Sequence, residues 1–251
     1  MSKTLVQQQF GKTAEYYLAS APHAKGDSLA WLLANTAPEP DWRMLDIATG
    51  AGHVAYQFAP QVARVWATDV TEEMLGIVSR EAEKRGFANV RTAYAKAESL
   101  PFEDATFDLV TCRIAPHHFD DVAAFVREVT RVLKPGGTFG LVDNIVPKGP
   151  VGDYVNAFEM LRDPSHAREL PMDEWRALMT ASGLTVTLED IAAKPMVFDT
   201  WAERHPAHVK GFLRALLSEA TPDVKAVLKP TEGPKGLSFE LAEGMFVAKK
   251  G

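Results

Sequence analysis

A glycine-rich loop followed by an acidic residue is the part of the sequence best suited to hold a ligand. The loop reads Asp46-Ile-Ala48-Thr49-Gly50-Ala-Gly52. Gly50 and Gly52 would let the backbone approach a ligand closely and turn tightly into a helix. Asp69 follows Gly50 by 69 − 50 = 19 residues, a spacing at which an acid can accept hydrogen bonds from both ribose hydroxyls. The pattern therefore predicts a site for a ligand that contains a nucleoside.

Asp46 helps to distinguish between two classes of nucleoside ligand. The segment from Gly50 to Ala55 fits the G-x-G-x-x-A pattern of dinucleotide sites, so such a site is one alternative. A pyrophosphate, however, is bound by backbone N–H groups and the positive end of a helix, with no carboxylate nearby. A carboxylate favours a ligand that carries an ammonium group. The alternative for Asp46 is an acid that only braces the turn.

Arg113, His117 and His118 follow a buried-strand pattern that ends at Cys112. The carboxyl ends of central strands in an open parallel sheet face the ligand crevice, so these side chains are expected beside a substrate. A histidine there would act as a general base or as a donor that orients the substrate, and Arg113 would bind an acidic group. Alternatively, one histidine caps the next helix, the other packs on it, and Arg113 braces the sheet. The side chains of adjacent histidines point in different directions on a helix or strand, and the sequence shows no further residues that would complete a set of metal ligands. No metal site is therefore predicted.

Alternating strand and helix patterns would place these residues on one sheet. Buried-strand patterns are expected at 43–48, 63–69, 89–95, 106–112 and 138–145. Apolar residues have helical spacing over 53–60, 71–85 and 120–133, and the residues 134–137, Lys-Pro-Gly-Gly, end the last of these helices. Short connections between such elements predict an α/β fold, with a parallel sheet covered by helices on both faces. The flanks at 4–37 and 150–231 are mostly helical, with strand candidates at 184–191 and 237–248.

Four segments resemble, in order and spacing, the motifs of class I S-adenosylmethionine-dependent methyltransferases. They are residues 46–52, 69–74, 97–102 and 131–137. Together they cover roughly residues 43–145, and the match is closest to the group that includes the ubiquinone and menaquinone C-methyltransferases. The resemblance implies S-adenosyl-L-methionine as the cofactor. It also implies a Rossmann-like sheet of seven mostly parallel strands with an antiparallel last strand, plus a helical cap.

The resemblance assigns the cofactor site residue by residue. Asp46 would face the ammonium group, backbone groups of Ala48, Thr49 and Gly50 would contact the methionine end, and Asp69 would bind the ribose. Val70 and Met74 would pack on the faces of the adenine, although both also fit an ordinary core stripe. The cofactor-site residues that follow are Tyr17, His23, Asp46, Ala48, Thr49, Gly50, Gly52, Asp69, Val70, Met74, Ala97 and Glu98.

Two positions depart from the pattern of this family. Ala48 stands where a glycine is common, a change that is harmless if its φ is negative. Lys96 stands where relatives often place an Asp that accepts a hydrogen bond from the adenine amino group, and a lysine cannot accept one. Adenine recognition is then expected to rest on the backbone N–H of Ala97 and on Glu98.

The family resemblance also divides the chain. Residues 1–251 form a single methyltransferase domain, with an N-terminal helical lid at 1–40, a cofactor-binding core at 43–145 and a helical insert on the acceptor side at 150–182. Tyr17 and His23 would cover the cofactor from the lid, unless this segment is an ordinary amphipathic helix. Phe158, Met160 and Trp175 of the insert would make the acceptor pocket apolar or belong to the core.

Composition restricts the setting of the protein. The 251 residues carry a formal net charge of −6, which disfavours DNA or an anionic membrane as a partner. A single cysteine excludes an intrachain disulfide, the first residues are too polar for a secretion signal, and no apolar stretch approaches the length of a membrane span. We therefore expect a cytoplasmic protein with no membrane insertion and leave a homodimer open.

The predicted function is methyl transfer from S-adenosylmethionine to a small-molecule acceptor, with carbon preferred over oxygen or nitrogen by resemblance alone. Two alternatives remain at this point. A non-catalytic S-adenosylmethionine-binding protein is one, and Lys96 gives it some support. An NAD-dependent oxidoreductase is the other, but it needs a set of hydride-transfer residues that the sequence does not contain.

Overall fold

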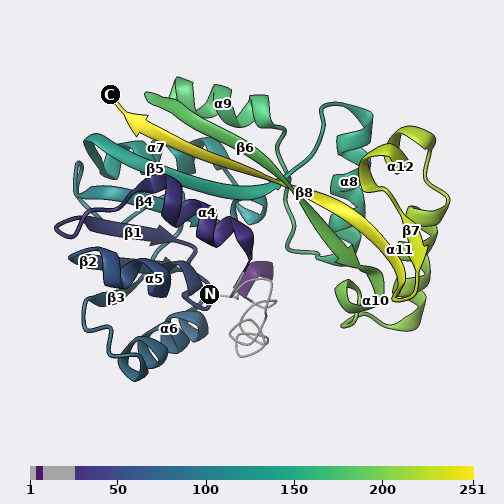
Figure 1. Cartoon of the computed structure of the whole chain (residues 1–251), viewed down its shortest axis with the longest axis horizontal. Helices are drawn as coiled ribbons and strands as arrows, with labels where there is room; N and C mark the ends of the chain where they lie inside the picture. The colour runs from purple at the N-terminus through teal and green to yellow at the C-terminus, as the bar shows by residue number, and fades with distance from the viewer. Residues whose placement is uncertain (1–3, 8–25) are drawn as a thin grey trace.

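One eight-stranded sheet organises the chain, in the order β3-β2-β1-β4-β5-β8-β6, with the short β7 paired to β8 (Figure 1). The computed structural model describes residues 4–7 and 26–251. The five strands from β3 to β5 are parallel, and β8 is antiparallel to both of its neighbours β5 and β6. The strands are β1 (Arg43–Ile47), β2 (Arg64–Asp69), β3 (Val90–Tyr94), β4 (Phe107–Arg113), β5 (Leu133–Ile145), β6 (Leu184–Val197), β7 (Thr231–Gly233) and β8 (Gly236–Lys250).

Helices connect these strands and cover both faces of the sheet. The α-helices are α4 (Asp27–Thr36), α5 (His53–Phe58), α6 (Glu72–Lys84), α7 (Val122–Val132), α8 (Pro150–Arg162), α9 (Met172–Ala181), α10 (Phe198–Trp201), α11 (Ala207–Ser218) and α12 (Pro222–Leu228). Two 3-10 turns, η1 (Ala59–Gln61) and η2 (Pro116–His118), follow α5 and β4. No helix in the described ranges is long and apolar enough to cross a membrane.

Alternation along the strands builds two cores, one on each face of the sheet. In β4, Leu109 packs with residues of α4, α5 and α6, whereas Val110 packs on the other face with residues of α7 and α9. Successive residues of a strand point to opposite faces, so strands buried on both sides read as nearly continuous apolar runs. This explains why strand and helix patterns in the sequence were sufficient to predict the layers.

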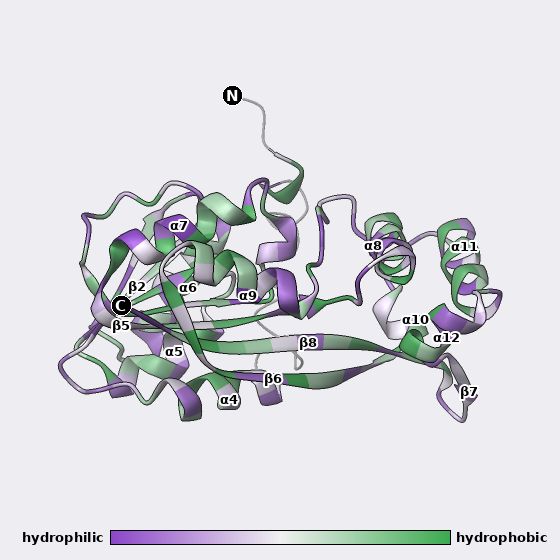
Figure 2. Ribbon diagram, turned by 90° about the horizontal axis from the view of Figure 1, so that it is seen from above, coloured by the Kyte–Doolittle hydropathy of each residue, from purple (hydrophilic) through white to green (hydrophobic). Residues whose placement is uncertain are grey.

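A small helical lobe with a third core stands beside the main sheet. The strands β6 and β8 extend beyond the ends of the parallel strands, and the lobe is attached to this extension (Figures 1 and 2). The lobe contains α8, α10, α11, α12 and β7. Its core includes Phe158, Trp201, Leu213 and Phe239, all buried. The helix α9 packs instead on the main sheet, against α7 and β6. The range 150–182, expected as one insert, thus divides between the lobe and the sheet.

The sheet differs from the expectation in two details. The strand β5 begins at Leu133, which pairs with Phe107, rather than at Thr138, so the 134–137 segment ends the helix and already belongs to the strand. The eighth strand is β7, whose three residues form a hairpin with the start of β8. The predicted mostly parallel, Rossmann-like α/β sheet with an antiparallel last strand is otherwise confirmed.

Candidate active site at the end of the sheet

A cavity of about 780 Å³ extends from the carboxyl ends of the parallel strands to the small lobe. One end is lined by the segments that follow β1, β2, β3 and β4. The other end is lined by residues of α8, of the 163–167 loop, of β6 and of α10. The parallel register of the strands puts their carboxyl ends on one edge, which brings the separate motifs together.

Asp46, the second-last residue of β1, braces the glycine loop. Its Oδ2 accepts a hydrogen bond of 2.6 Å from the Thr49 hydroxyl, and its Oδ1 accepts one of 2.8 Å from the Thr111 hydroxyl of β4. Burial raises the pKa of this carboxyl to about 6, against the lowering effect of the two hydroxyls. Asp46 also lines the cavity, and each carboxylate oxygen has a second lone pair for a ligand. Bracing is therefore observed, and ammonium binding stays a prediction.

The loop holds three residues in the left-handed region, Ala48 at φ 51°, Gly50 at φ 53° and Gly52 at φ 86°. The negative φ that would make Ala48 harmless is not observed, so the alanine bears the strain that a glycine would avoid. A Cβ on Gly50 would meet no atom within 4 Å, which leaves the backbone open to a ligand on that side. A Cβ on Gly52 would lie 2.6 Å from Cζ of Tyr56.

Asp69 joins the glycine loop to β2. Its Oδ2 accepts a hydrogen bond of 3.0 Å from the Gly50 N–H, and its Oδ1 accepts one of 2.8 Å from the Thr71 N–H. Burial raises the pKa of the carboxyl. The Thr49 N–H donates to the carbonyl of Thr68 at 2.8 Å, so the N–H groups of Thr49 and Gly50 are already bonded within the protein. The Thr49 carbonyl accepts the Gly52 N–H at 2.9 Å and keeps a second lone pair for a ligand.

Residues after β2 and from the N-terminal segment line the cavity beside Asp69. Met74 is buried and Val70 is half-buried, and both line the cavity. The Gln7 side-chain amide donates a hydrogen bond of 2.7 Å to the Val70 carbonyl, which places the described residues 4–7 over this end. Tyr17 and His23, the predicted lid residues, lie outside the described residues.

The segment after β3 forms the next wall. Ala97 is buried and Glu98 is half-buried, and the Glu98 carboxylate accepts a hydrogen bond of 3.0 Å from the Asp120 N–H. No described residue accepts a hydrogen bond from the Ala97 N–H. Lys96 is exposed and lines the cavity, so the departure from the family pattern faces the ligand space.

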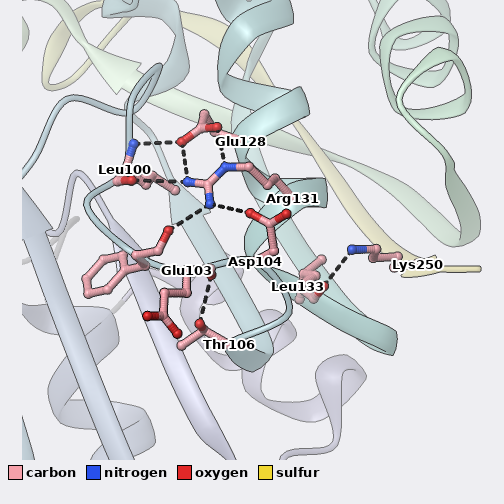
Figure 3. Close-up of polar contacts among 9 residues, drawn as sticks. Leu100, Glu103, Asp104, Thr106, Glu128, Arg131, Leu133 and Lys250 are labelled. Atoms are coloured by element: carbon pink, nitrogen blue, oxygen red, sulfur yellow. Dashed lines mark hydrogen bonds and ion pairs between the residues drawn. The ribbon is translucent and has the colours of Figure 1, made fainter.

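Arg131 fixes this wall from behind, as Figure 3 shows. Its guanidinium donates to both oxygens of Glu128 at 2.7 Å and to the carbonyls of Leu100 at 3.1 Å and Phe102 at 2.7 Å. It also pairs with Asp104 at 2.8 Å. Glu128 in turn accepts the Leu100 N–H at 2.7 Å. The 131–137 motif therefore holds the 97–104 segment in place without contacting the cavity.

His117 forms a buried pair with Asp143, a residue of β5 that was not predicted. The His117 Nδ1 and the Asp143 Oδ1 are 2.6 Å apart. Burial raises the pKa of Asp143 to about 8 and lowers that of His117 to about 3, so the pair holds one titratable proton near neutral pH. This proton belongs in the short bond, because Asp143 Oδ2 has no partner among the described residues. Nε2 then carries a hydrogen and is a donor to a ligand. Above a pH of about 8 it becomes an acceptor.

Two further imidazoles line the cavity beside this pair. The ring centroids of His118 and His166 are 4.2 Å and 5.6 Å from that of His117. The His118 Nδ1–H donates to the Ser165 carbonyl at 2.9 Å, and the His166 Nε2–H donates to the Asn156 side-chain oxygen at 2.9 Å. Burial lowers the pKa of each to about 4, so both are neutral at physiological pH. Arg113 also lines the cavity, and its Nε donates to the Ser28 hydroxyl at 3.2 Å.

The lobe-side end is more polar than expected. Phe158 and Trp175 are buried in cores, Met160 is exposed, and none of the three lines the cavity. Of the two alternatives expected for these residues, the core holds for Phe158 and Trp175, and Met160 belongs to neither. The helix α8 lines the cavity instead with Glu159 and Arg162. The lobe-side residues that the sequence did not reveal are Asn144, Glu159, Arg162, His166, Lys194, Met196, Trp201 and Leu241. Among the residues that were not predicted, only Asp143 and Asn144 could have been found from the sequence, because they are polar residues at the end of an apolar strand.

Known proteins resemble this chain over most of its length. A methyltransferase domain model matches residues 45–141. The uncharacterized methyltransferase YcgJ of Bacillus subtilis is 43% identical over 198 residues, which are 78% of this chain and 78% of that protein. The ubiquinone/menaquinone biosynthesis C-methyltransferase UbiE of Brucella anthropi is 34% identical over 163 residues, 60% of this chain and 61% of that protein.

Solved structures agree with the sequence matches. The YcgJ crystal structure superposes with a TM-score of 0.85 and 37% identity, covering 89% of this chain and 98% of that one. A putative methyltransferase from Bacillus halodurans C-125 superposes with a TM-score of 0.86 and 33% identity, covering 90% and 99%. The dinucleotide and non-catalytic alternatives are thereby set aside. The chain belongs to the class I S-adenosylmethionine-dependent methyltransferases, and it is an enzyme whose cofactor is S-adenosyl-L-methionine.

Proposed function

We propose that the acceptor is a small molecule that binds in the lobe-side end of the cavity, opposite the glycine loop. The observation that carries this proposal is the division of one continuous cavity between two unlike linings. One end has the open backbone at Gly50 and the acids Asp46 and Asp69. The other has imidazoles and a mixture of polar and apolar side chains.

The residues fit the cofactor at the glycine-loop end. In this proposal Asp46 and the loop carbonyls, with Ala48 and Thr49, bind the ammonium group, while Asp69 accepts from the ribose. Gly52 turns the loop, Val70 and Met74 contact the adenine faces, and the Ala97 N–H and Glu98 bind its edge. S-adenosylmethionine supplies a methyl group on a sulfonium, for in-line displacement by the acceptor.

His117 is the residue we assign to the acceptor. Its Nδ1 is held on Asp143, so Nε2 is the nitrogen that remains for a ligand. At neutral pH Nε2–H would donate to an acceptor oxygen and orient it, and at higher pH the same nitrogen would accept a proton. His118 is anchored through Ser165 and would close the same side, with Arg113 at the junction of the two ends.

Carbon is the atom we propose to be methylated, supported by the resemblance to the UbiE C-methyltransferase. The test supplies S-adenosylmethionine with a ¹³C-labelled methyl group and a panel of small acceptors. The chemical shift of the transferred carbon separates C-, O- and N-methyl products. An N- or O-methyl product would overturn the preference for carbon, and a methylated macromolecule would overturn the small-molecule proposal.

The cofactor-site assignment is tested by isothermal titration calorimetry with S-adenosylhomocysteine and NAD. We expect S-adenosylhomocysteine to bind and NAD not to bind. Asp69→Asn should weaken binding by about tenfold or more, because a charge-assisted hydrogen bond is worth about 1.5–3 kcal/mol. Asp108→Asn, which alters a carboxylate on β4 outside the cavity, is the matched control. Equal binding by the Asp69 variant would refute the ribose assignment.

The remaining expectations are proposals of the same kind. Residues 1–40 would act as a lid, and the contact between Gln7 and Val70 supports this. The α8 part of the 150–182 range would shape the acceptor end. A cytoplasmic location and a homodimer stay predictions, which fractionation and light scattering would test.

A further inference from the structure

Arg162 is a guanidinium at the lobe-side end of the cavity that forms no ion pair with a described carboxylate. It is the last residue of α8 and lines the cavity. Its Cζ lies 5.2 Å from the centroid of the Trp201 ring, which is a cation–π contact. Trp201 is itself buried and packs on Phe158 at 4.9 Å and on Phe239 at 5.0 Å. The guanidinium therefore rests on a rigid platform.

Two acids lie near Arg162, and its charge acts to lower the pKa of both, but neither pairs with its guanidinium. No described carboxylate lies within ion-pair distance of its guanidinium. The Asp163 Oδ1 accepts two hydrogen bonds from Ser165, from its N–H at 2.9 Å and from its hydroxyl at 2.6 Å. Glu159 is buried, its Oε1 has no partner among the described residues, and burial raises its pKa. Neither residue supplies the bidentate carboxylate that a guanidinium binds best.

Lys194, a second cation of this end, differs from Arg162 in this respect. Its ammonium group lies 3.1 Å from Glu243 and 3.1 Å from the side-chain oxygen of Asn144. Its charge is therefore paired within the protein, and it reinforces the wall. Of these two cations, Arg162 is the one that forms no ion pair with a described carboxylate, so a ligand would satisfy its donors.

We propose that the methyl acceptor is an organic acid whose carboxylate or phosphate group binds the Arg162 guanidinium. This inference rests on the proposed function of the lobe-side end. The same cavity is also lined by Met196, Trp201 and Leu241, which fit an apolar body of the acceptor. In this proposal the Nε2–H of His117 donates to an oxygen of the same molecule. The acceptor class is thus a hydroxylated acid with an apolar centre.

Four probes that share a phenol ring test the charge requirement. They are 4-hydroxybenzoate, 4-hydroxyphenyl phosphate, the neutral 4-hydroxybenzamide and the cationic 4-hydroxybenzylamine. Each is titrated into the full chain saturated with S-adenosylhomocysteine. We expect at least one of the two acids to bind about tenfold more tightly than the amide, as one charge-assisted bidentate contact implies. The more tightly bound acid identifies the anionic group as carboxylate or phosphate.

Two variants assign the preference to Arg162. Arg162→Gln should abolish the difference between acid and amide, and Arg162→Lys should retain part of it. Arg168→Gln is the control, because this arginine is paired with Glu174 and lies outside the cavity. An amide or amine that binds as well as both acids, a preference that survives in Arg162→Gln, or binding of none of the probes would overturn the proposal.

The affinity for S-adenosylhomocysteine is measured first in every titration. Its loss in the wild type would count against the cofactor site, and its loss only in Arg162→Gln would reveal a folding defect. In the second case Arg162→Lys, with its charge kept and its planar fork lost, still tests the proposal. A wild-type preference for acids that this variant retains in full would refute bidentate recognition.

Discussion

Gly50 and Gly52 allow a sharp test, because each is in the left-handed region but only one is crowded. Ala48 already holds an alanine at φ 51°, so the same backbone at Gly50, with φ 53°, will accommodate one too. The left-handed region costs a non-glycine residue about 1–2 kcal/mol, and roughly 0.5–1 kcal/mol is recovered because alanine loses less conformational entropy on folding. We expect Gly50→Ala to reduce the free energy of unfolding by only about 0.5–1 kcal/mol.

Gly52→Ala should be far more damaging to stability. Its Cβ would lie 2.6 Å from Tyr56 Cζ and 2.7 Å from Tyr56 Oη. The Tyr56 ring is buried and lies between Phe87, at 6.4 Å between ring centroids, and the Arg85 guanidinium at 4.5 Å. Overpacking of this kind costs about 1–3 kcal/mol beyond the backbone strain, so about 3 kcal/mol is expected in total. The melting temperature should fall by roughly 6–12 °C, against about 1–4 °C for Gly50→Ala.

Cofactor binding should rank the two variants in the opposite way to stability. The methyl group of Gly50→Ala enters the open space beside the loop, where a Cβ meets no protein atom within 4 Å. We expect it to weaken S-adenosylhomocysteine binding by about tenfold or more, in a protein that is nearly as stable as the wild type. Scanning calorimetry and titration calorimetry measure both quantities. Wild-type affinity in Gly50→Ala would show that no ligand packs on this surface, and equal stabilities of the two variants would refute the crowding at Tyr56.

Two further predictions concern the proton shared by His117 and Asp143 and the cluster around Arg131. The pKa of His117 is 6.5 in the unfolded chain and about 3 in the fold, and the pKa of Asp143 is 3.8 in the unfolded chain and about 8 in the fold. Between pH 6.5 and 8 the folded pair therefore holds more protons than the unfolded pair. The free energy of unfolding should therefore fall by about 1–2 kcal/mol over that interval, and Asp143→Asn should remove this fall, which urea denaturation at successive pH values measures. An unchanged slope would show that the pair does not share a proton. Arg131→Gln should lower the free energy of unfolding by about 2 kcal/mol, after allowance for partial exposure, and a change below about 0.5 kcal/mol in urea denaturation would contradict the bracing role. Arg127→Gln, which alters a more exposed arginine of the same helix, is its control.

The layers of the fold were predictable because burial on both faces of a parallel sheet leaves a periodic trace in the sequence. The segment 106–112 was expected as a strand, and Phe107–Arg113 is one. The lobe was not predictable in this way. The strand β6 is the edge strand of the sheet and most of its residues are exposed, so it shows no clear apolar alternation. Helices on either side of it gave no sign of whether they pack on the sheet or on each other.

The glycine-loop end of the cavity is built from segments that carry local sequence motifs, whereas the lobe-side end depends on tertiary contacts. Asp46, Asp69 and Gly50 are brought together by neighbouring parallel strands, which the spacing of the motifs already implied. Arg162, at the end of α8, and His166, in the loop after it, reach the cavity through the tertiary position of the lobe, which no sequence pattern encodes. The conformation of Ala48 was missed because residue type predicts a left-handed φ only for glycine.

The separate core of the lobe has a consequence for how this enzyme can change over evolutionary time. Residues at the lobe-side end of the cavity such as Trp201 draw their packing from the lobe, while the glycine loop draws its packing from the two cores of the sheet. Substitutions at sites without shared contacts have nearly additive effects on stability. If the acceptor binds at the lobe-side end as proposed, the lobe can change its lining while the glycine-loop end stays the same. Substrate diversification in such a chain is modular, and recombination of lobes between relatives is a natural route to new specificity.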